Sequence, residues 1–392
     1  MTLSFSDWTT AQQAESLGWF ERLHAMPETG FGESRTAAFI AGELRGLGLE
    51  VITGLGGTGV VGLLRGPKAT ADAPFIGLRA ELDALPMQGP VDGTVQTPDG
   101  PRYHGCGHDG HMATLLTAAA ALSRRGDLGC NVAFLFQPAE ELLTGAAAML
   151  ADGLLDRVPL SAIYALHNIP GLPAGSVGVV EGAALASSDE IRVTVRARGT
   201  HGAAPQTGQD AILAAAHFLG LSQQLLTRRT DGRDSAVLSF GQIAGGQAPN
   251  VLPDQVGIAG SLRCHSEQAR AAVHALLADA AQSTTSAFGT PVDLAIDPKV
   301  PVLINDPVCA ARVRDSVVRR LGAGRLIATP RPVMASEDFS LFLKHVPGAY
   351  FFVGQDGAFC HHPDYRFDTG IIPVGATILI DLVLGASAEP RG

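Results

Sequence analysis

The sequence has no run of lysine and arginine residues, and its overall charge is negative. It holds 28 Lys and Arg against 38 Asp and Glu, which gives a formal net charge of −10 with neutral histidines. A surface of this sign repels the phosphates of nucleic acids and the head groups of anionic lipids. We therefore expect neither nucleic acid nor a membrane surface as a partner.

Long apolar segments, a leader and a disulfide pattern are absent as well. No stretch approaches the length of a transmembrane helix, and the N-terminal segment has neither the basic region nor the apolar core of a secretory leader. The five cysteines stand at positions 106, 130, 264, 309 and 360, which is an odd and scattered set. Because disulfide frameworks belong to oxidising compartments, we expect a reducing, cytoplasmic location.

The bulk composition is that of a folded globular protein. Hydrophobic residues make up 46% of the chain and charged residues 17%, which is unlike a disordered sequence. A chain of 392 residues is too long for one small core. We therefore expect two domains, one of them inserted in the other.

Short apolar runs alternate with helical patterns through much of the chain. Helices are predicted at 6–26, at 34–48, from Asp109 and at Cys309–Leu321, and strands at Val60–Leu64, Phe75–Leu78, Val132–Phe136, Ile163–Leu166 and Ala349–Val353. This alternation predicts an α/β domain whose mostly parallel sheet is sandwiched by helices. In such folds, functional sites form at the carboxyl ends of the strands.

The pattern changes from about Ser188. Strands are predicted at 191–197, 236–244, 256–263 and 292–296, with helices that begin at Asp210 and Ser266. This βαββαβ order predicts an α+β domain with a mostly antiparallel sheet. We accordingly divide the chain into a domain formed by residues 1–187 and 299–392 and an inserted domain formed by residues 188–298.

The run His104-Gly-Cys-Gly-His108 precedes the helix predicted from Asp109. Its glycines permit backbone conformations that direct the side chains of Cys106 and His108 to one point. Thiolate and imidazole ligands suit zinc and neighbouring transition metals rather than magnesium or calcium. The pair therefore predicts a metal site.

Glu140 and Glu141 follow the strand predicted at Val132–Phe136, which Pro138 ends. They are expected at the carboxyl edge of the sheet. Adjacent side chains point in different directions, so one carboxylate could bind a metal while the other acts as a general base. The alternative is a solvated acidic pair at the start of a helix beginning at Leu142, which the helix dipole would favour.

Histidines supply further candidate ligands. His167 ends the apolar run at 161–166, and His361 and His362 follow the strand predicted at Ala349–Val353. A lone histidine at a strand end is often only a hydrogen-bonded loop residue, but several compatible donors at such positions indicate a metal centre. Two divalent ions held by this set would acidify a bound water and polarise a carbonyl, which is the chemistry of amide hydrolysis.

At these residues the chain resembles a family of metal-dependent amidohydrolases. The family includes hippurate hydrolase, plant auxin–amino acid conjugate hydrolases and N-acetyldiaminopimelate deacetylase, and it is related to the aminoacylases and glutamate carboxypeptidases. The matching blocks extend over nearly the whole chain: His24–Glu28 with Glu33, Leu78–Pro86, His104–His111, Phe136–Glu141, His167–Asn168, Gly199–Pro205, Pro249–Pro253, Ser336–Phe339 and His361–Tyr365. The order and spacing of so many blocks argue against a chance match.

The resemblance implies a role for each matching residue. Cys106 would bridge two metal ions, with Glu141 and His361 completing one site and His108 and His167 the other. Glu140 would be the general base that deprotonates the water and later protonates the leaving amine. Asp83 would not bind a metal itself but would hold the ligand imidazoles in the correct orientation. His201 and Asn250 of the inserted domain would close over the substrate and bind its carboxylate or the developing oxyanion.

Three positions depart from the family pattern. Glu81 stands where an aspartate is usual, and this change affects the arrangement of the groups that support the ligands. Gln206 stands where a histidine is frequent, which bears on substrate contacts. His362 occupies a position that is often small and polar, so it competes with the neighbouring His361 as a candidate ligand.

The resemblance implies that the protein hydrolyses an amide bond in small N-acyl amino acids with a metal-activated water and two divalent ions (Zn, Mn, Co or Ni) per chain. A dipeptidase or carboxypeptidase, acting on short peptides, would use the same site and differ only in pocket shape. The third alternative is a catalytically silent metal- or ligand-binding homologue, which the retention of Glu140 and of the whole ligand set disfavours. We also expect a homodimer or homotetramer formed through the inserted lid domain.

Overall fold

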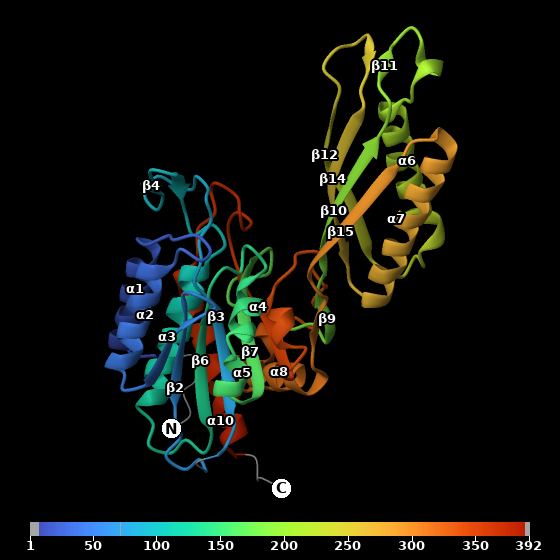
Figure 1. Ribbon diagram of the computed structural model, residues 1–392. Coiled ribbons are helices and arrows are strands. Elements are labelled where there is room, and N and C mark those ends of the chain that lie inside the picture. Colours follow the sequence, from blue (N-terminus) through green and yellow to red (C-terminus); the bar gives the residue numbers. More distant parts are fainter. Residues whose placement is uncertain (1–7, 71, 389–392) are drawn as a thin grey trace. The chain divides into compact units, whose positions relative to one another are not determined.

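Figure 1 shows the computed structural model, which describes residues 8–70 and 72–388. The chain forms two compact units. The first contains the described residues of the segments 1–184, 304–331 and 338–392, and the second contains residues 185–303 and 332–337. Residues 1–7 lie outside the described residues. They include residues 6 and 7 of the first predicted helix and the beginning of the segment in which a secretory leader was sought.

The first unit is built on a seven-stranded sheet with the order β1-β2-β6-β3-β7-β17-β8. Its strands are β1 (Glu50–Leu55), β2 (Gly59–Leu64), β3 (Phe75–Glu81), β6 (Asn131–Gln137), β7 (Leu160–Pro170), β8 (Val177–Gly178) and β17 (Gly348–Gln355). The central strands β6, β3, β7 and β17 pair in parallel, whereas β1, β2 and β8 form antiparallel pairs toward the edges. The predicted mostly parallel sheet is confirmed at the centre, and the antiparallel edges were not predicted.

Helices cover both faces of this sheet (Figure 1). The core on one face includes residues of α1 (Thr10–His24), α2 (Ser34–Gly46), α3 (His108–Ser123), α8 (Pro307–Leu321) and α10 (Ile372–Ala388). The other face carries α4 (Gly145–Ala151) and α9 (Phe339–Phe342), with α5 (Leu154–Arg157) next to α4. Strand side chains alternate between the faces. Leu78 therefore joins the first core, whereas its neighbour Arg79 lies over Phe339 of α9.

Local sequence signals set the ends of the first helices. The helix predicted at 6–26 begins only at Thr10, because the side chain of Thr9 accepts a hydrogen bond from the Gln12 amide and Gln12 reciprocates. The helix predicted at 34–48 ends at Gly46, and Gly48 takes a left-handed φ of 82° that favours glycine. The helix predicted from Asp109 begins at His108, after Gly107 with a φ of 91°.

The second unit contains a four-stranded antiparallel sheet with the order β12-β14-β10-β15. Its main elements are β10 (Ser188–Arg196), α6 (Ala211–Arg229), β12 (Ala236–Gly245), β14 (Gln255–Cys264), α7 (Glu267–Phe288) and β15 (Val292–Val300), with the short η2 (Pro205–Thr207) and the paired β11 (Thr200–His201) and β13 (Val251–Leu252). Asp210 and Ser266 cap α6 and α7. The predicted βαββαβ order is thus confirmed.

The remaining elements are short. They are β4 (Val95–Thr97), β5 (Gly100–Arg102), β9 (Gly182–Leu185), β16 (Leu303–Asn305), η3 (Ala323–Arg325) and η4 (Thr369–Ile371).

The expectation that no segment has the length of a membrane span is wrong. Within the described residues, Thr369–Ser387, which includes η4 and nearly all of α10, is long and apolar enough to cross a membrane. However, 67% of its apolar window is buried inside the protein. The helix also carries the buried Asp381, which pairs with Arg319 and Arg320. Because a core helix needs the same composition as a span, α10 is explained as the central core helix of the first unit.

The start of α4 leaves no room for a side chain. A Cβ at Gly145 would lie 1.5 Å from the carbonyl oxygen of Pro138, whereas a Cβ at Gly126 would meet nothing within 4 Å. We predict that Gly145→Ala lowers the free energy of unfolding by about 1–3 kcal/mol or more, because the backbone after β6 must move. Gly126→Ala should change it by less than about 0.5 kcal/mol. Urea titrations of the two variants test this, and equal midpoints would contradict it.

Candidate metal centre

The candidate ligands of the first unit gather where the central strands end. Asp83 follows β3, and Glu140 and Glu141 follow β6. His361 lies in the loop after β17. Cys106 and His108 stand at the start of α3, and their side chains approach these loops. This is the carboxyl edge of the parallel strands, where the sequence predicts a site.

Two local predictions at this edge are wrong. His167 does not end its strand, because β7 continues to Pro170 and stays paired with β17. The helix after the acidic pair begins at Gly145 instead of Leu142, because the Leu143 amide donates to the Glu140 carbonyl oxygen at 2.7 Å and closes a turn. Since both carboxylates lie in this turn, the dipole of a helix starting at Leu142 does not explain the acidic pair.

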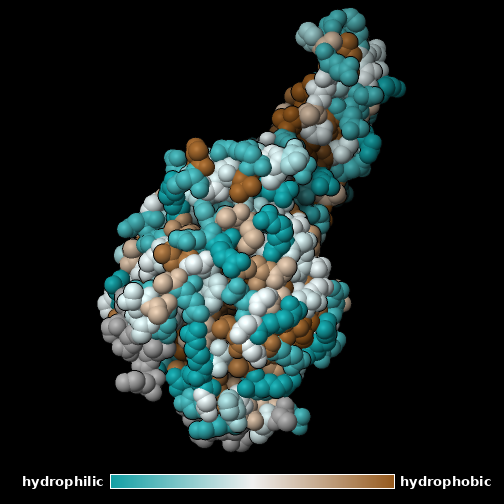
Figure 2. Space-filling model, turned by 90° about the vertical axis from the view of Figure 1, so that its left-hand side faces the viewer, coloured by the Kyte–Doolittle hydropathy of each residue, from teal (hydrophilic) through white to brown (hydrophobic). Residues whose placement is uncertain are grey.

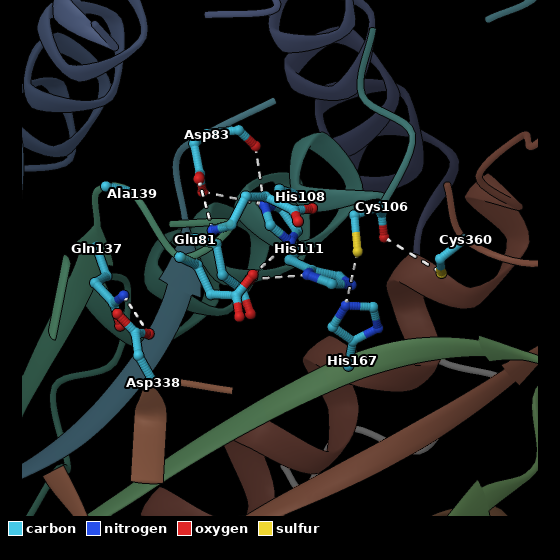
Figure 3. Close-up of polar contacts among 12 residues, drawn as sticks. Glu81, Asp83, Cys106, His108, His111, Gln137, Ala139, His167, Asp338 and Cys360 are labelled. Carbon is cyan, nitrogen blue, oxygen red and sulfur yellow. Dashed lines mark hydrogen bonds and ion pairs between the residues drawn. The ribbon is translucent and has the colours of Figure 1, made fainter. Parts of the chain in front are cut away.

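Two groups of potential ligand atoms share the sulfur of Cys106. Cys106, His108 and His167 form one group, and Cys106, Glu141 and His361 form the other. Within each group the ligand atoms lie within 4.8 Å of one another. The Cys106 Sγ lies 3.3 Å from the His167 Nε2, and the two side chains point toward each other in Figure 3. These groups have the same members as the two sites that the resemblance implies.

Hydrogen bonds orient two of the imidazoles. The Nδ1 of His108 lies 2.8 Å from the carbonyl oxygen of Asp83, and the Nδ1 of His167 lies 2.6 Å from the carbonyl oxygen of Asn168. A carbonyl only accepts, so both Nδ1 atoms donate and both Nε2 atoms can offer a lone pair. The Nε2 of His108 is buried and has no hydrogen-bond partner among the described residues. A buried lone pair without a donor is what a metal ligand presents before the ion binds.

The electrostatics of the site also fit a bound cation. The hydrogen bond with Cys360, burial and the charge of Glu141 raise the pKa of the Cys106 thiol well above its usual value. Burial lowers the pKa of His108, but the bond to Asp83 and the nearby carboxylates outweigh it and raise this pKa to about 10. Burial and the neighbouring His111 lower the pKa of His167 to about 3. A cation would stabilise the thiolate and displace the His108 proton, and soft sulfur with imidazole suits a transition metal.

Asp83 connects two of the candidate ligands. Its carboxylate Oδ2 accepts a hydrogen bond from the Glu141 amide at 2.9 Å, and its Oδ1 lies 3.3 Å from the Nδ1 of His108. The side chain is fully buried. Asp83 therefore holds the backbone of Glu141 and the ring of His108 in position. This matches the supporting role that the resemblance implies.

Glu81, the first departure from the family pattern, lies behind the ligands. It is fully buried and accepts hydrogen bonds from Arg79 and, at 2.8 Å, from the Nδ1 of His111. Burial would raise the pKa of Glu81, but Arg79 and His111 hold it well below its usual range. The Nε2 of His111 in turn lies 2.8 Å from the side-chain Oδ1 of Asn168 and 3.1 Å from its backbone nitrogen. Glu81 thus supports the backbone beside His167, a connection that the sequence alone did not reveal.

The loops around the ligands have an unusual backbone. Among the described residues, the non-glycine residues with positive φ are Phe31 (61°), Ala139 (49°), Leu143 (55°) and His361 (67°). Ala139 and Leu143 bracket the acidic pair, and the Ala139 amide donates to the buried Glu33 at 2.8 Å. Such conformations are costly and persist where the surroundings impose them. They mark these loops as constrained to position Glu140, Glu141 and His361.

The other predicted residues have distinct places. Glu140 is buried, with its Oε2 at 3.8 Å from the His108 Nε2. His362 belongs to no group of candidate ligands among the described residues; its ring is half exposed, and its Nδ1 accepts a hydrogen bond from the Asp364 backbone amide at 3.1 Å. In the second unit, His201 of β11 pairs with Val251 of β13, which is the chain neighbour of Asn250. Gln206 lies exposed in η2 of that unit.

Comparisons with known proteins agree with this geometry. The sequence profile of Peptidase family M20/M25/M40 matches residues 77–385. The chain is 34% identical over 363 residues to N-acetyl-L-cysteine deacetylase of Bacillus subtilis, covering 92% of this chain and 85% of that protein. It is 33% identical over 372 residues to hippurate hydrolase of Campylobacter jejuni, covering 94% and 96%.

A solved structure extends the similarity to the fold. The YXEP protein of Bacillus subtilis, described as a dinuclear metal binding peptidase from the M20 family, matches with a TM-score of 0.83 and 28% identity. The match covers 98% of this chain and 100% of that chain. A metal-binding fold of this kind is consistent with the clusters of candidate ligands found here.

The shared position of Cys106 leads to a test by metal analysis. We predict that the protein, dialysed against zinc, retains close to two ions per chain and that Cys106→Ala loses most of both, because its sulfur belongs to both ligand groups. Cys309, buried in α8 and outside every candidate group of the described residues, provides the control Cys309→Ala. Inductively coupled plasma mass spectrometry measures the content. Two ions in Cys106→Ala would rule out the bridging role.

Proposed function

The chain belongs to Peptidase family M20/M25/M40 and is a hydrolase of that family; we propose that it cleaves the amide bond of small N-acyl amino acids with two divalent metal ions. One observation carries the proposal: Cys106 belongs to two groups of candidate ligands, and Glu140 lies next to His108 and Glu141 of these groups. The relatives named above include a deacetylase of N-acetyl-L-cysteine and a hydrolase of hippurate, both of which act on N-acyl amino acids.

We assign Cys106 as the ligand shared by both ions. Glu141 and His361 would complete one site, and His108 and His167 the other. The oriented imidazoles support the assignment, as does the buried Nε2 of His108, which has no hydrogen-bond partner in the described part of the chain. When bound, the two ions would polarise the scissile carbonyl and make the attacking water more acidic. Thiolate and imidazole favour zinc, and manganese, cobalt or nickel are the alternatives.

Glu140 would act as the general base. Its carboxylate is buried and lies among the ligand atoms of His108 and Glu141, where it is held away from bulk water. From that position it would take a proton from the attacking water and transfer it to the nitrogen of the leaving amine. Asp83 would keep His108 and the Glu141 backbone in place during both proton transfers.

The second unit would supply the substrate contacts. His201 and Asn250 are both exposed, and the Gly202 amide donates to the Asn250 carbonyl oxygen, so the segments that carry them are neighbours. They could bind a ligand carboxylate or a developing oxyanion. We propose that residues 188–298 act as a lid domain on a catalytic domain formed by residues 1–187 and 299–392. We further propose that the protein is cytoplasmic and assembles as a homodimer or homotetramer through the lid.

A substrate panel with Glu140→Gln tests the proposal. We predict that the wild-type protein hydrolyses N-acetyl or N-benzoyl amino acids and that Glu140→Gln lowers kcat by roughly 10²–10⁴-fold, because glutamine cannot take the proton. Metal content should not fall, since Glu140 is not an assigned ligand. Glu21→Gln, on an exposed position of α1, is the matched control. Equal turnover by wild type and Glu140→Gln would remove the general-base assignment.

The same panel separates the two enzymatic alternatives. Dipeptides and N-acyl amino acids present the same amide bond, but a dipeptide carries a free α-amine where the N-acyl compound is neutral. Preference for dipeptides in kcat/KM would identify a dipeptidase with the same site. Zinc binding without turnover of any compound in the panel would indicate a catalytically silent homologue.

A further inference from the structure

A second thiol lies next to the shared ligand. The Cys360 thiol donates to the carbonyl oxygen of Cys106 at 3.8 Å, so the two cysteines are neighbours in space. Figure 3 shows Cys360 directed toward Cys106 from the loop after β17. Cys360 is partly exposed, whereas Cys106 is 8% exposed. An oxidant from solution therefore has better access to Cys360.

The backbones that carry these cysteines are already joined. The amide of His361 donates to the carbonyl oxygen of Gly105 at 2.8 Å, so each cysteine is the chain neighbour of a residue in this hydrogen bond. A disulfide requires Cα atoms roughly 4.4–6.8 Å apart, a separation found between segments hydrogen bonded in this way. The side chains can therefore meet without unfolding of either loop.

Cys360 has no part in the proposed metal chemistry. It belongs to no group of candidate ligands among the described residues, although it is adjacent in sequence to His361. The Nδ2 of Asn168 also donates to its sulfur at 3.8 Å. Cys130, Cys264 and Cys309 are buried and form no disulfide, so the Cys106–Cys360 pair differs from them in combining a neighbouring thiol with solvent access.

We propose that Cys106 and Cys360 form a reversible thiol switch that controls loading of the metal centre. In the metal-free protein, oxidation by a peroxide joins the two sulfurs in a disulfide, and reduction restores both thiols. The disulfide sulfur of Cys106 carries no negative charge and is a much weaker ligand than a thiolate. Because Cys106 belongs to both ligand groups, one bond blocks both ions. The switch rests on the proposed role of Cys106 as the shared ligand.

The oxidation balances with hydrogen peroxide as the oxidant. The sulfur of Cys360 attacks one peroxide oxygen, the O–O bond breaks, and the released hydroxide takes the thiol proton as water. The sulfenic acid that remains on Cys360 is attacked by the sulfur of Cys106. The S–S bond forms, the S–O bond breaks, and the second hydroxide leaves with the Cys106 proton as water. The two thiols lose two electrons, which reduce the peroxide.

Peptide mapping tests the bond directly. Trypsin cleaves after Arg102, Arg124, Lys344 and Arg366, which places Cys106 in the peptide 103–124 and Cys360 in the peptide 345–366, each as its single cysteine. We expect mass spectrometry of the metal-free, peroxide-treated protein to show these two peptides cross-linked, and dithiothreitol to separate them. Absence of the cross-linked pair, with both thiols still free or separately oxidised, would overturn the proposal.

Zinc uptake provides the functional readout. After peroxide treatment the wild-type protein should lose most of its zinc uptake and regain it with dithiothreitol. In Cys360→Ser and Cys360→Ala this recoverable loss should be much smaller, because the buried Cys106 then has no partner thiol with which to form a disulfide. Cys309→Ala should behave like the wild type. A recoverable loss of the same size in the Cys360 variants would overturn the proposal.

The measurements keep this inference separate from the proposed activity. A protein that shows the reversible disulfide and binds zinc, but hydrolyses none of the amides, would contradict the function and leave the switch standing. A protein that hydrolyses them but never forms the Cys106–Cys360 bond would contradict the switch alone.

Discussion

The candidate metal centre depends on one constraint: a single sulfur atom must be within reach of candidate ligands from separate loops. Cys106 meets it because its neighbours have no side chains. Gly107 has a φ of 91°, and a Cβ there would lie 2.3 Å from the hydroxyl of Tyr365. The carbonyl of Gly105 accepts from the His361 amide, which fixes the loop after β17 beside the start of α3. The parallel sheet brings the other ligand loops to the same edge.

The charges around this sulfur are balanced in two different ways. On the sheet side, the fully buried Arg79 pairs with Glu81 and Asp338 and also donates to Gln137 at 2.9 Å. On the ligand side, burial raises the pKa of the Glu141 carboxyl, but His361, His108 and Cys106 outweigh it and lower this pKa. All three of these residues can serve as metal ligands. Permanent charge therefore supports the site from behind, whereas the charge in front depends on proton or metal occupancy. This division suits a centre that binds cations on one side and stays rigid on the other.

Much of the fold follows from local patterns in the sequence. The alternation of apolar runs predicted the parallel centre of the sheet, and the capping residues Asp210 and Ser266 predicted the helices of the second unit. Where patterns were weak, the prediction failed. His167 and Asn168 were not predicted as strand because they are polar, yet β7 continues through them because they pair with Phe352 and Val353 of β17. The apolar segment 369–387 is a buried helix, which is a matter of packing that composition does not reveal.

The sequence alone identified the kinds of candidate ligand, their order along the chain and the carboxyl edge of the sheet as their meeting place, because residue type and the alternation of strands with helices are local properties of the chain. The preference for His361 over His362 came from family resemblance, since neither residue type nor spacing distinguishes these two neighbours. Tertiary contacts were needed to place His361 beside Glu141 and to orient the imidazole of His108 with its Nε2 toward the site. They also connect Glu81 to Asn168 through His111, and they bring Cys360 next to Cys106. These features depend on contacts between residues far apart in the chain, and such contacts arise only when the sheet and its helices have packed.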